Sequence, residues 1–98
     1  MNLFRHQKAY GEYGHEPTNP LLAEDIDSGY KLLSRLRMPD GSRVTYKRVG
    51  SQIPSNIQRP VDKYEISDAS GKQIATLYLY VYHVVTAYDA PEGFTIAS

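Results

Sequence analysis

The side chains best suited to chemistry in this chain are basic and lie close together in the sequence. Residues 31–63 contain eight of the eleven lysines and arginines and only two carboxylates, Asp40 and Asp62. This segment therefore has a net charge of +6, although the formal charge of the whole chain is zero. A local field of this kind attracts phosphate groups or the carboxylates of a partner. The charge pattern thus predicts an anion-facing surface.

A β-hairpin is expected to place these basic residues on one face. Residues 30–38 and 42–50 alternate with a period of two and flank Pro39-Asp40-Gly41, which is typical of a tight turn. In the register of a three-residue loop, Arg37 faces Arg43, while Leu36 and Val44 meet on the opposite, apolar face. The predicted binding residues are Arg35, Arg37, Arg43 and Lys47, together with Tyr82.

A solvated surface is the alternative explanation for this basic face, as is pairing within the chain with Glu24, Asp25 and Asp27. Domains that bind nucleic acid usually have a pI above about 9. The pI of this sequence is about 6.8, which argues against extensive contact with phosphates.

The aromatic residues are mostly tyrosine, with nine tyrosines, two phenylalanines and no tryptophan. Tyrosine suits half-buried strands and contact surfaces, because its ring packs while its hydroxyl stays hydrated or bonded. Tyr78, Tyr80 and Tyr82 share one face of residues 72–87, where they could stack on bases. Their neighbours are aliphatic rather than basic. We therefore expect this row to form core or a subunit contact.

His83 is the weak candidate for a catalytic residue. An imidazole near a tyrosine and several arginines could provide the general base and the phosphate-binding groups of a metal-independent ribonuclease. The expected sheet offers no second histidine or carboxylate at a suitable position, so we assign no catalytic residue. His6 and His15 match no metal-ligand spacing, and the chain has no cysteine. The sequence therefore predicts neither a metal nor a cofactor.

Two consecutive hairpins and one helix account for most of the chain. Asn19-Pro20 is typical of a helix start and Gly29 of a helix end, which predicts a short N-terminal helix over about 20–28. Residues 62–67 and 72–87 flank the second turn, and the long arm 72–87 is uncharged on both faces from Ile74 to Val85. Such a strand belongs in the interior of a sheet. Residues 94–96 are expected to add a short edge strand.

The fold class predicted from these elements is α+β and mostly β. A single antiparallel sheet of four to five strands would follow the chain as a meander, with one short N-terminal helix. Residues 1–19 are expected to form a flexible N-terminal arm, because they show no periodicity and little apolar surface. Residues 20–98 would then form a single small β-rich domain.

The function predicted is that of a small non-enzymatic binding module. It would engage a protein with an acidic surface through the tyrosine-rich sheet and the basic hairpin. Two alternatives are a single-stranded RNA or DNA binder that uses the hairpin, and a ribonuclease centred on His83. A second copy of the chain is a further candidate partner. No segment reaches the roughly 18 apolar residues of a membrane span, and the first residues lack a secretory signal. We therefore expect a cytoplasmic protein without a membrane partner.

Overall fold

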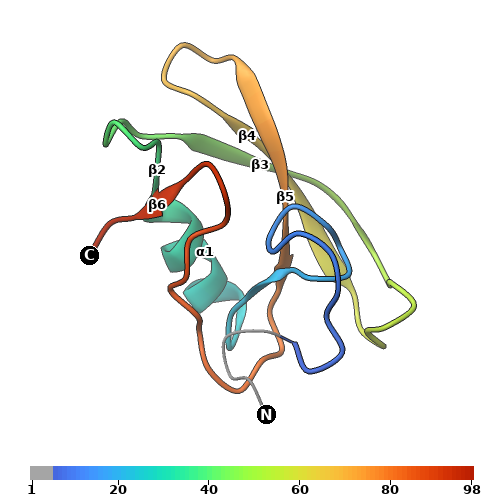
Figure 1. Cartoon of the computed structure of the whole chain (residues 1–98). Coiled ribbons are helices and arrows are strands. Elements are labelled where there is room, and N and C mark those ends of the chain that lie inside the picture. The colour runs from blue at the N-terminus through green and yellow to red at the C-terminus, as the bar shows by residue number, and fades with distance from the viewer. Residues whose placement is uncertain (1–5) are drawn as a thin grey trace.

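The computed structural model describes residues 6–98, which form two sheets and one helix (Figure 1). The larger sheet has four strands in the order β1-β5-β4-β3, and the smaller sheet pairs β2 with β6. The helix α1 spans Ile26–Ser34. The strands are β1 Leu21–Leu22, β2 Leu36–Arg37, β3 Thr45–Gln52, β4 Val61–Ser67, β5 Gln73–Tyr80 and β6 Thr95–Ile96. The prediction of a small, mostly β protein with one helix is confirmed.

The prediction of a single antiparallel sheet is wrong. β1 runs parallel to β5, with Leu21 opposite Leu79, so the larger sheet is mixed. β3, β4 and β5 do follow one another as an antiparallel meander. The strand that contains Leu36 pairs instead with β6, which forms the separate two-stranded sheet.

β5 lies between β1 and β4, as the uncharged pattern predicted for an interior strand. It ends at Tyr80, however, whereas the sequence predicted a strand as far as residue 87. Beyond Tyr80 the backbone turns to the other side of the β1 segment. The amide of His83 donates to the carbonyl of Ala23 at 3.0 Å, and that of Ala87 to the carbonyl of Leu22 at 3.0 Å. These contacts hold the apolar run after Tyr80 outside the sheet.

The helix lies later in the chain than the predicted range 20–28. Its N-cap is Asp25, whose side chain accepts a hydrogen bond from the amide of Ser28 at 2.8 Å. Gly29 does not end the helix, because it lies inside α1 against the sheet. A Cβ atom there would come within 2.8 Å of Leu79 Cδ2. The glycine therefore allows a close approach between helix and strand, which a sequence pattern does not distinguish from a helix stop.

The first hairpin is limited to its turn. The amide of Met38 donates to the carbonyl of Ser42 at 2.9 Å, and Arg37 bridges Arg43 in the predicted register. On either side of the turn the two expected strands separate. Leu36 pairs with Ile96 rather than facing Val44. The segment before Leu36 is helical, and the helix brings Leu32 and Leu33, both almost fully buried, onto the side that faces the core.

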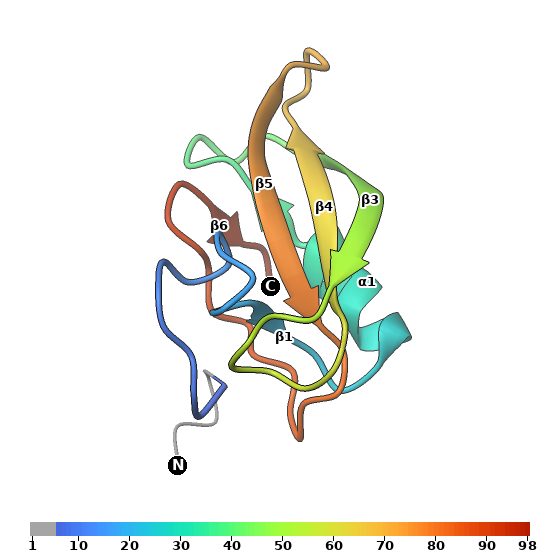
Figure 2. The same cartoon turned by 90° about the vertical axis from the view of Figure 1, so that its right-hand side faces the viewer.

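The main core lies between α1 and one face of the larger sheet. It includes Leu32 and Leu33 from α1 and Leu77 and Leu79 from β5. A second, smaller cluster covers the other face near the end of β5, where the loop between β3 and β4 crosses the sheet (Figure 2). Its members are Leu22, Ile57, Val61, Tyr80 and Ala87. The sheet is thus covered on both faces only at this end.

The N-terminal segment, residues 6–19, lies beside β5 in both ribbon views (Figures 1 and 2). The amide of Tyr78 donates to the carbonyl of Gly14 at 2.9 Å. The side-chain amide of Asn56 donates to the carbonyls of Lys8 at 2.9 Å and Thr18 at 2.8 Å. Tyr13 is buried in the main core. Flexibility of the arm 1–19 in solution stays a prediction, and its residues 1–5 lie outside the described residues.

Removal of residues 1–17 tests that prediction, because loss of a flexible arm would leave the melting temperature unchanged. From the contacts of Tyr13 and Tyr78 we expect instead a melting temperature lower by roughly 10 °C, since the truncation exposes the cavity that Tyr13 fills and leaves the Tyr78 amide unpaired. Thermal unfolding followed by circular dichroism measures this change. The control removes residues 1–5 only, which takes away none of these contacts. An unchanged melting temperature for both proteins would establish an arm that is independent of the core.

The interior position of β5 can be tested with Leu79→Ala. Leu79 is only 1% exposed, so we expect a loss of about 2–5 kcal/mol in the free energy of unfolding. Val84→Ala is the control, because Val84 is 69% exposed and its truncation should cost less than about 0.5 kcal/mol. Chemical denaturation measures both values. Equal losses in the two variants would contradict the burial of β5.

Candidate binding site

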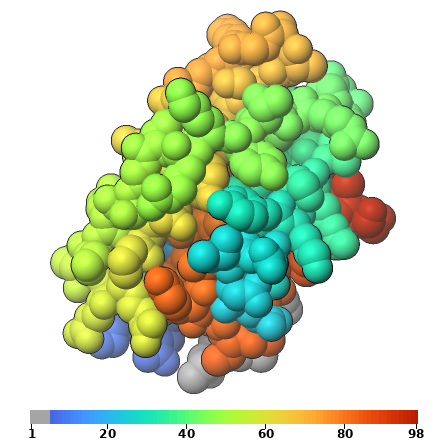
Figure 3. All heavy atoms as spheres, turned by 180° about the vertical axis from the view of Figure 1, so that it is seen from behind, coloured from blue at the N-terminus to red at the C-terminus, as the bar shows by residue number. Residues whose placement is uncertain are grey.

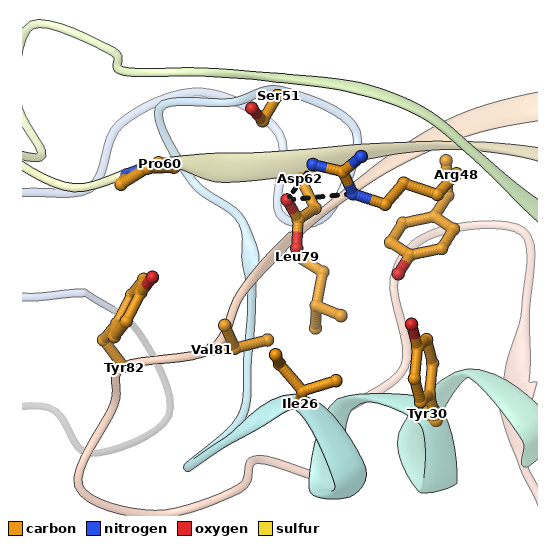
Figure 4. A pocket seen from close by; sticks show the side chains of 10 residues that line it. Ile26, Tyr30, Arg48, Ser51, Pro60, Asp62, Leu79, Val81 and Tyr82 are labelled. Carbon is orange, nitrogen blue, oxygen red and sulfur yellow. Dashed lines mark hydrogen bonds and ion pairs between the residues drawn. The ribbon is translucent and has the colours of Figure 1, made fainter.

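A cavity of about 390 Å³ opens between α1 and the region where β3 ends and β4 begins (Figure 4). We call it the helix–sheet pocket. Ile26 and Tyr30 of α1 form one wall, and Arg48 and Asp62 form the opposite wall. Tyr82 stands at one end. Leu79, Val81, Ser51, Pro60 and Tyr64 complete the lining.

The helical period explains the first wall of this pocket. Ile26 and Tyr30 are four residues apart and therefore lie on the same side of α1. Ile26 is 59% exposed, Tyr30 46% and Tyr82 48%. Three large apolar or aromatic side chains are thus open to solvent around one cavity. Exposed apolar groups that cluster in this way are a common mark of a contact site.

The opposite wall contains an ion pair. Arg48 donates from Nη2 to Asp62 Oδ1 at 3.1 Å and from Nε at 3.3 Å (Figure 4). A bulge in β3 between Arg48 and Gly50 shifts the register, so that Ser51 rather than Gly50 stands opposite Asp62. This shift allows both Arg48 and Ser51 to line the pocket. The sequence offered no signal for it beyond the glycine itself.

Tyr64 adds a neutral hydroxyl to this wall. Burial raises its pKa to about 12, and the neighbouring Tyr30 and Asp62 act in the same direction, while Arg48 acts against them. Tyr64 is therefore protonated throughout the physiological range. The influence of Tyr30 on this pKa shows that the phenol groups of α1 and β4 are close to each other.

A shallow hollow of about 590 Å³ adjoins the helix–sheet pocket, and Ile26, Val81 and Tyr82 line both. Its remaining lining residues are Glu24, Asp25 and Asp27, so we call it the acidic hollow. The backbone hydrogen bond from Ser28 keeps the pKa of Asp25 below its usual value. Figure 3 shows the face on which α1 (cyan) and the start of β4 (yellow) flank the chain that follows β5 (orange). Apolar and acidic groups are therefore adjacent here.

The four basic residues predicted as a binding face are distributed over several elements. The guanidinium of Arg35, at the C-cap of α1, lies 4.9 Å from the ring centre of Tyr88. Arg37 donates from Nη1 to the carbonyls of Ser34 and Leu36, each at 2.9 Å. Arg43 is exposed beside the turn, and Lys47 of β3 stands opposite Glu65 of β4. None of the four lines the helix–sheet pocket, whereas Tyr82 does.

The basic side chain that contacts Tyr82 is Arg59, which the sequence analysis did not single out. Its guanidinium carbon lies 4.8 Å from the centre of the Tyr82 ring. Arg59 comes from the loop between β3 and β4. Its proximity to residue 82 depends on long-range contacts, for which the sequence gave no signal.

His83 lies near a second imidazole that the expected sheet did not contain. Burial is the largest cause that lowers the pKa of His6, and the neighbouring His83 and Lys8 lower it further. His6 also meets Tyr80 edge-on, with ring centres 5.5 Å apart. Within residues 6–98, no three histidine or carboxylate side chains are grouped as metal ligands would be.

Comparisons with protein-family models, curated proteins and solved structures gave no match for this chain. In the part of the chain that the structure describes, no helix is long and apolar enough to cross a membrane.

The wall that contains Tyr64 can be tested by its pH dependence. The pKa of Tyr64 is about 12 in the folded protein and 10.0 in a free tyrosine. Protonation of Tyr64 therefore stabilises the fold below pH 10, and this contribution is lost as the pH rises from 10 to about 12. We expect Tyr64→Phe to reduce the fall in melting temperature over that interval. Tyr10→Phe, at an exposed tyrosine outside the pocket, should show the same pH dependence of the melting temperature as the wild type. If Tyr64→Phe also showed the wild-type dependence, the raised pKa of Tyr64 would be contradicted.

Proposed function

We propose that this protein is a small non-enzymatic binding module that receives a segment of a partner protein in the helix–sheet pocket. The observation that supports this function best is the exposure of Ile26, Tyr30 and Tyr82 around one cavity of about 390 Å³. Burial of these side chains by a partner removes apolar surface from water, which is the main favourable term in association. Tyrosine is also among the residues enriched at interfaces.

The charge around the pocket defines the partner segment more closely. Glu24, Asp25 and Asp27 surround the acidic hollow, which is continuous with the apolar walls. A segment that places an aliphatic side chain between Ile26 and Tyr82 and a lysine or arginine beside it would satisfy both surfaces. At this site the partner segment is therefore basic, whereas the basic hairpin suggested an acidic partner. Arg37 donates to backbone carbonyls of this chain, which limits what it can offer to a carboxylate.

The ion pair at the back of the pocket contributes mainly to shape and specificity. Arg48 and Asp62 have side chains 52% and 20% exposed, so an occupant would remove water from both. The free energy needed to desolvate an ion pair is often as large as the attraction between its two charges. We therefore assign the affinity to the three exposed apolar side chains and the acidic rim. A cavity of about 390 Å³ receives only a short segment, so we assign the interaction to the transient class.

Selection from a random peptide library displayed on phage tests this function. We expect the enriched peptides to share an aliphatic residue next to lysine or arginine. Binding of a selected peptide should shift the NMR signals of Ile26, Tyr30 and Tyr82 and should weaken as salt is added, because the acidic rim is solvent-exposed.

Two isoleucines provide a matched control for that experiment. Ile26 is 59% exposed in the pocket, and Ile53 is 64% exposed in the loop after β3, outside both cavities. Ile26→Ser should weaken the selected peptides about tenfold or more, and Ile53→Ser should leave their affinity unchanged. Equal effects of the two substitutions, or a selection of acidic peptides, would refute the proposed function.

A further inference from the structure

A separate cavity of about 280 Å³ lies between the N-terminal segment and the loop that joins β3 to β4. We call it the basic pocket. Its lining includes His6, Lys8, Ser55, Asn56, Arg59 and Tyr80. No carboxylate lines it within the described residues, and the structure pairs neither Lys8 nor Arg59 with one there. An ammonium and a guanidinium that face one cavity without a counter-charge favour an anion.

Both walls of the basic pocket are held in place by specific contacts. Asn56 donates to the carbonyls of Lys8 and Thr18 at 2.9 and 2.8 Å, which ties the loop to the N-terminal segment. Arg59 lies 4.8 Å from the ring centre of Tyr82. Stacking on an aromatic face leaves the in-plane N–H groups of a guanidinium directed outward, where they can donate in pairs to phosphate oxygens. The guanidinium of Arg59 is thus positioned before any ligand binds.

The imidazole of His6 completes the pocket. It packs edge-on against Tyr80 with ring centres 5.5 Å apart, and its Nδ1 accepts from the amide of Lys8 at 3.3 Å. Burial lowers the pKa of His6, and the neighbouring His83 and Lys8 lower it further. A bound anion would act in the opposite direction and raise the pKa of His6.

We propose that the basic pocket binds the phosphate group of a nucleotide, either free or within a single strand. Arg59 and Lys8 contact the phosphate oxygens, and the base lies against Tyr82, a residue that is 48% exposed. Base stacking on an aromatic side chain together with a phosphate clamp is the general chemistry of single-strand recognition. This inference goes beyond the proposed function, because it concerns another cavity and another class of ligand.

NMR titration of the full chain with inorganic phosphate, AMP and hexauridylate tests the proposal. All three probes should shift the signals of His6 and Arg59, and AMP should raise the pKa of His6. AMP should bind more tightly than inorganic phosphate, because only AMP reaches Tyr82. If hexauridylate binds about tenfold more tightly than AMP, the natural ligand is a strand; equal affinities indicate a free nucleotide. Absence of a saturable shift at His6 and Arg59 would overturn the proposal.

Arg59→Gln and Arg43→Gln form a matched pair, because both remove one positive charge and Arg43 lies outside the basic pocket. We expect Arg59→Gln to weaken AMP binding about tenfold or more and Arg43→Gln to change it less than about twofold. Equal losses would show attraction by net charge alone and refute the site. If Arg59→Gln does not fold, Lys8→Gln replaces it with the same expectation. Ile26→Ser should leave AMP binding unchanged, which separates this result from that of the proposed function.

Discussion

The parallel pairing of β1 with β5 is the contact on which the other features depend. Leu21 and Leu22 are fully buried, and the chain after them is bonded on two sides. The amide of Ala23 donates to the carbonyl of Tyr80 at 2.8 Å, and the carbonyl of Ala23 accepts from His83 at 3.0 Å. Buried backbone groups must be paired, so this short segment is fixed between β5 and the chain that follows it. It thereby determines where α1 begins and where the N-terminal segment runs.

Local signals in the sequence were sufficient for the β4–β5 hairpin and for the turn at Gly41. In both cases a polar turn lies between strands that are neighbours along the chain, so the contacts are short-range. β1 could not be found in this way, because two leucines show no period and their partner strand lies far along the sequence. The same difficulty applies to Gly29. A glycine that ends a helix and one that lets the helix approach Leu79 look alike until the strand is in place.

The candidate site was predictable only in part. Tyr82 was named from the sequence, and it lines the helix–sheet pocket. Ile26 and Tyr30 have helical spacing and would have followed from a helix capped by Asp25, since Asp-Ile-Asp-Ser is a recognisable helix start. Arg48 depends on the β-bulge, and Arg59 on a loop that crosses the end of the sheet. Those two positions are consequences of tertiary structure.

Several basic residues of the segment 31–63 make separate contacts in the structure. Arg37 contacts carbonyls at the end of α1, Arg48 pairs with Asp62, and Arg35 stacks on Tyr88. Three of the eight basic residues in the middle of the chain therefore make local contacts within the fold, and the basic binding face stays a prediction.

Tyr82 connects the acidic hollow with the basic pocket. One side of this residue borders the acidic hollow, and its ring supports Arg59 of the basic pocket. The partner segment proposed for the helix–sheet pocket and the nucleotide proposed for the basic pocket would both contact Tyr82. If the two ligands prefer different positions of its ring, each would weaken the binding of the other by the same free energy.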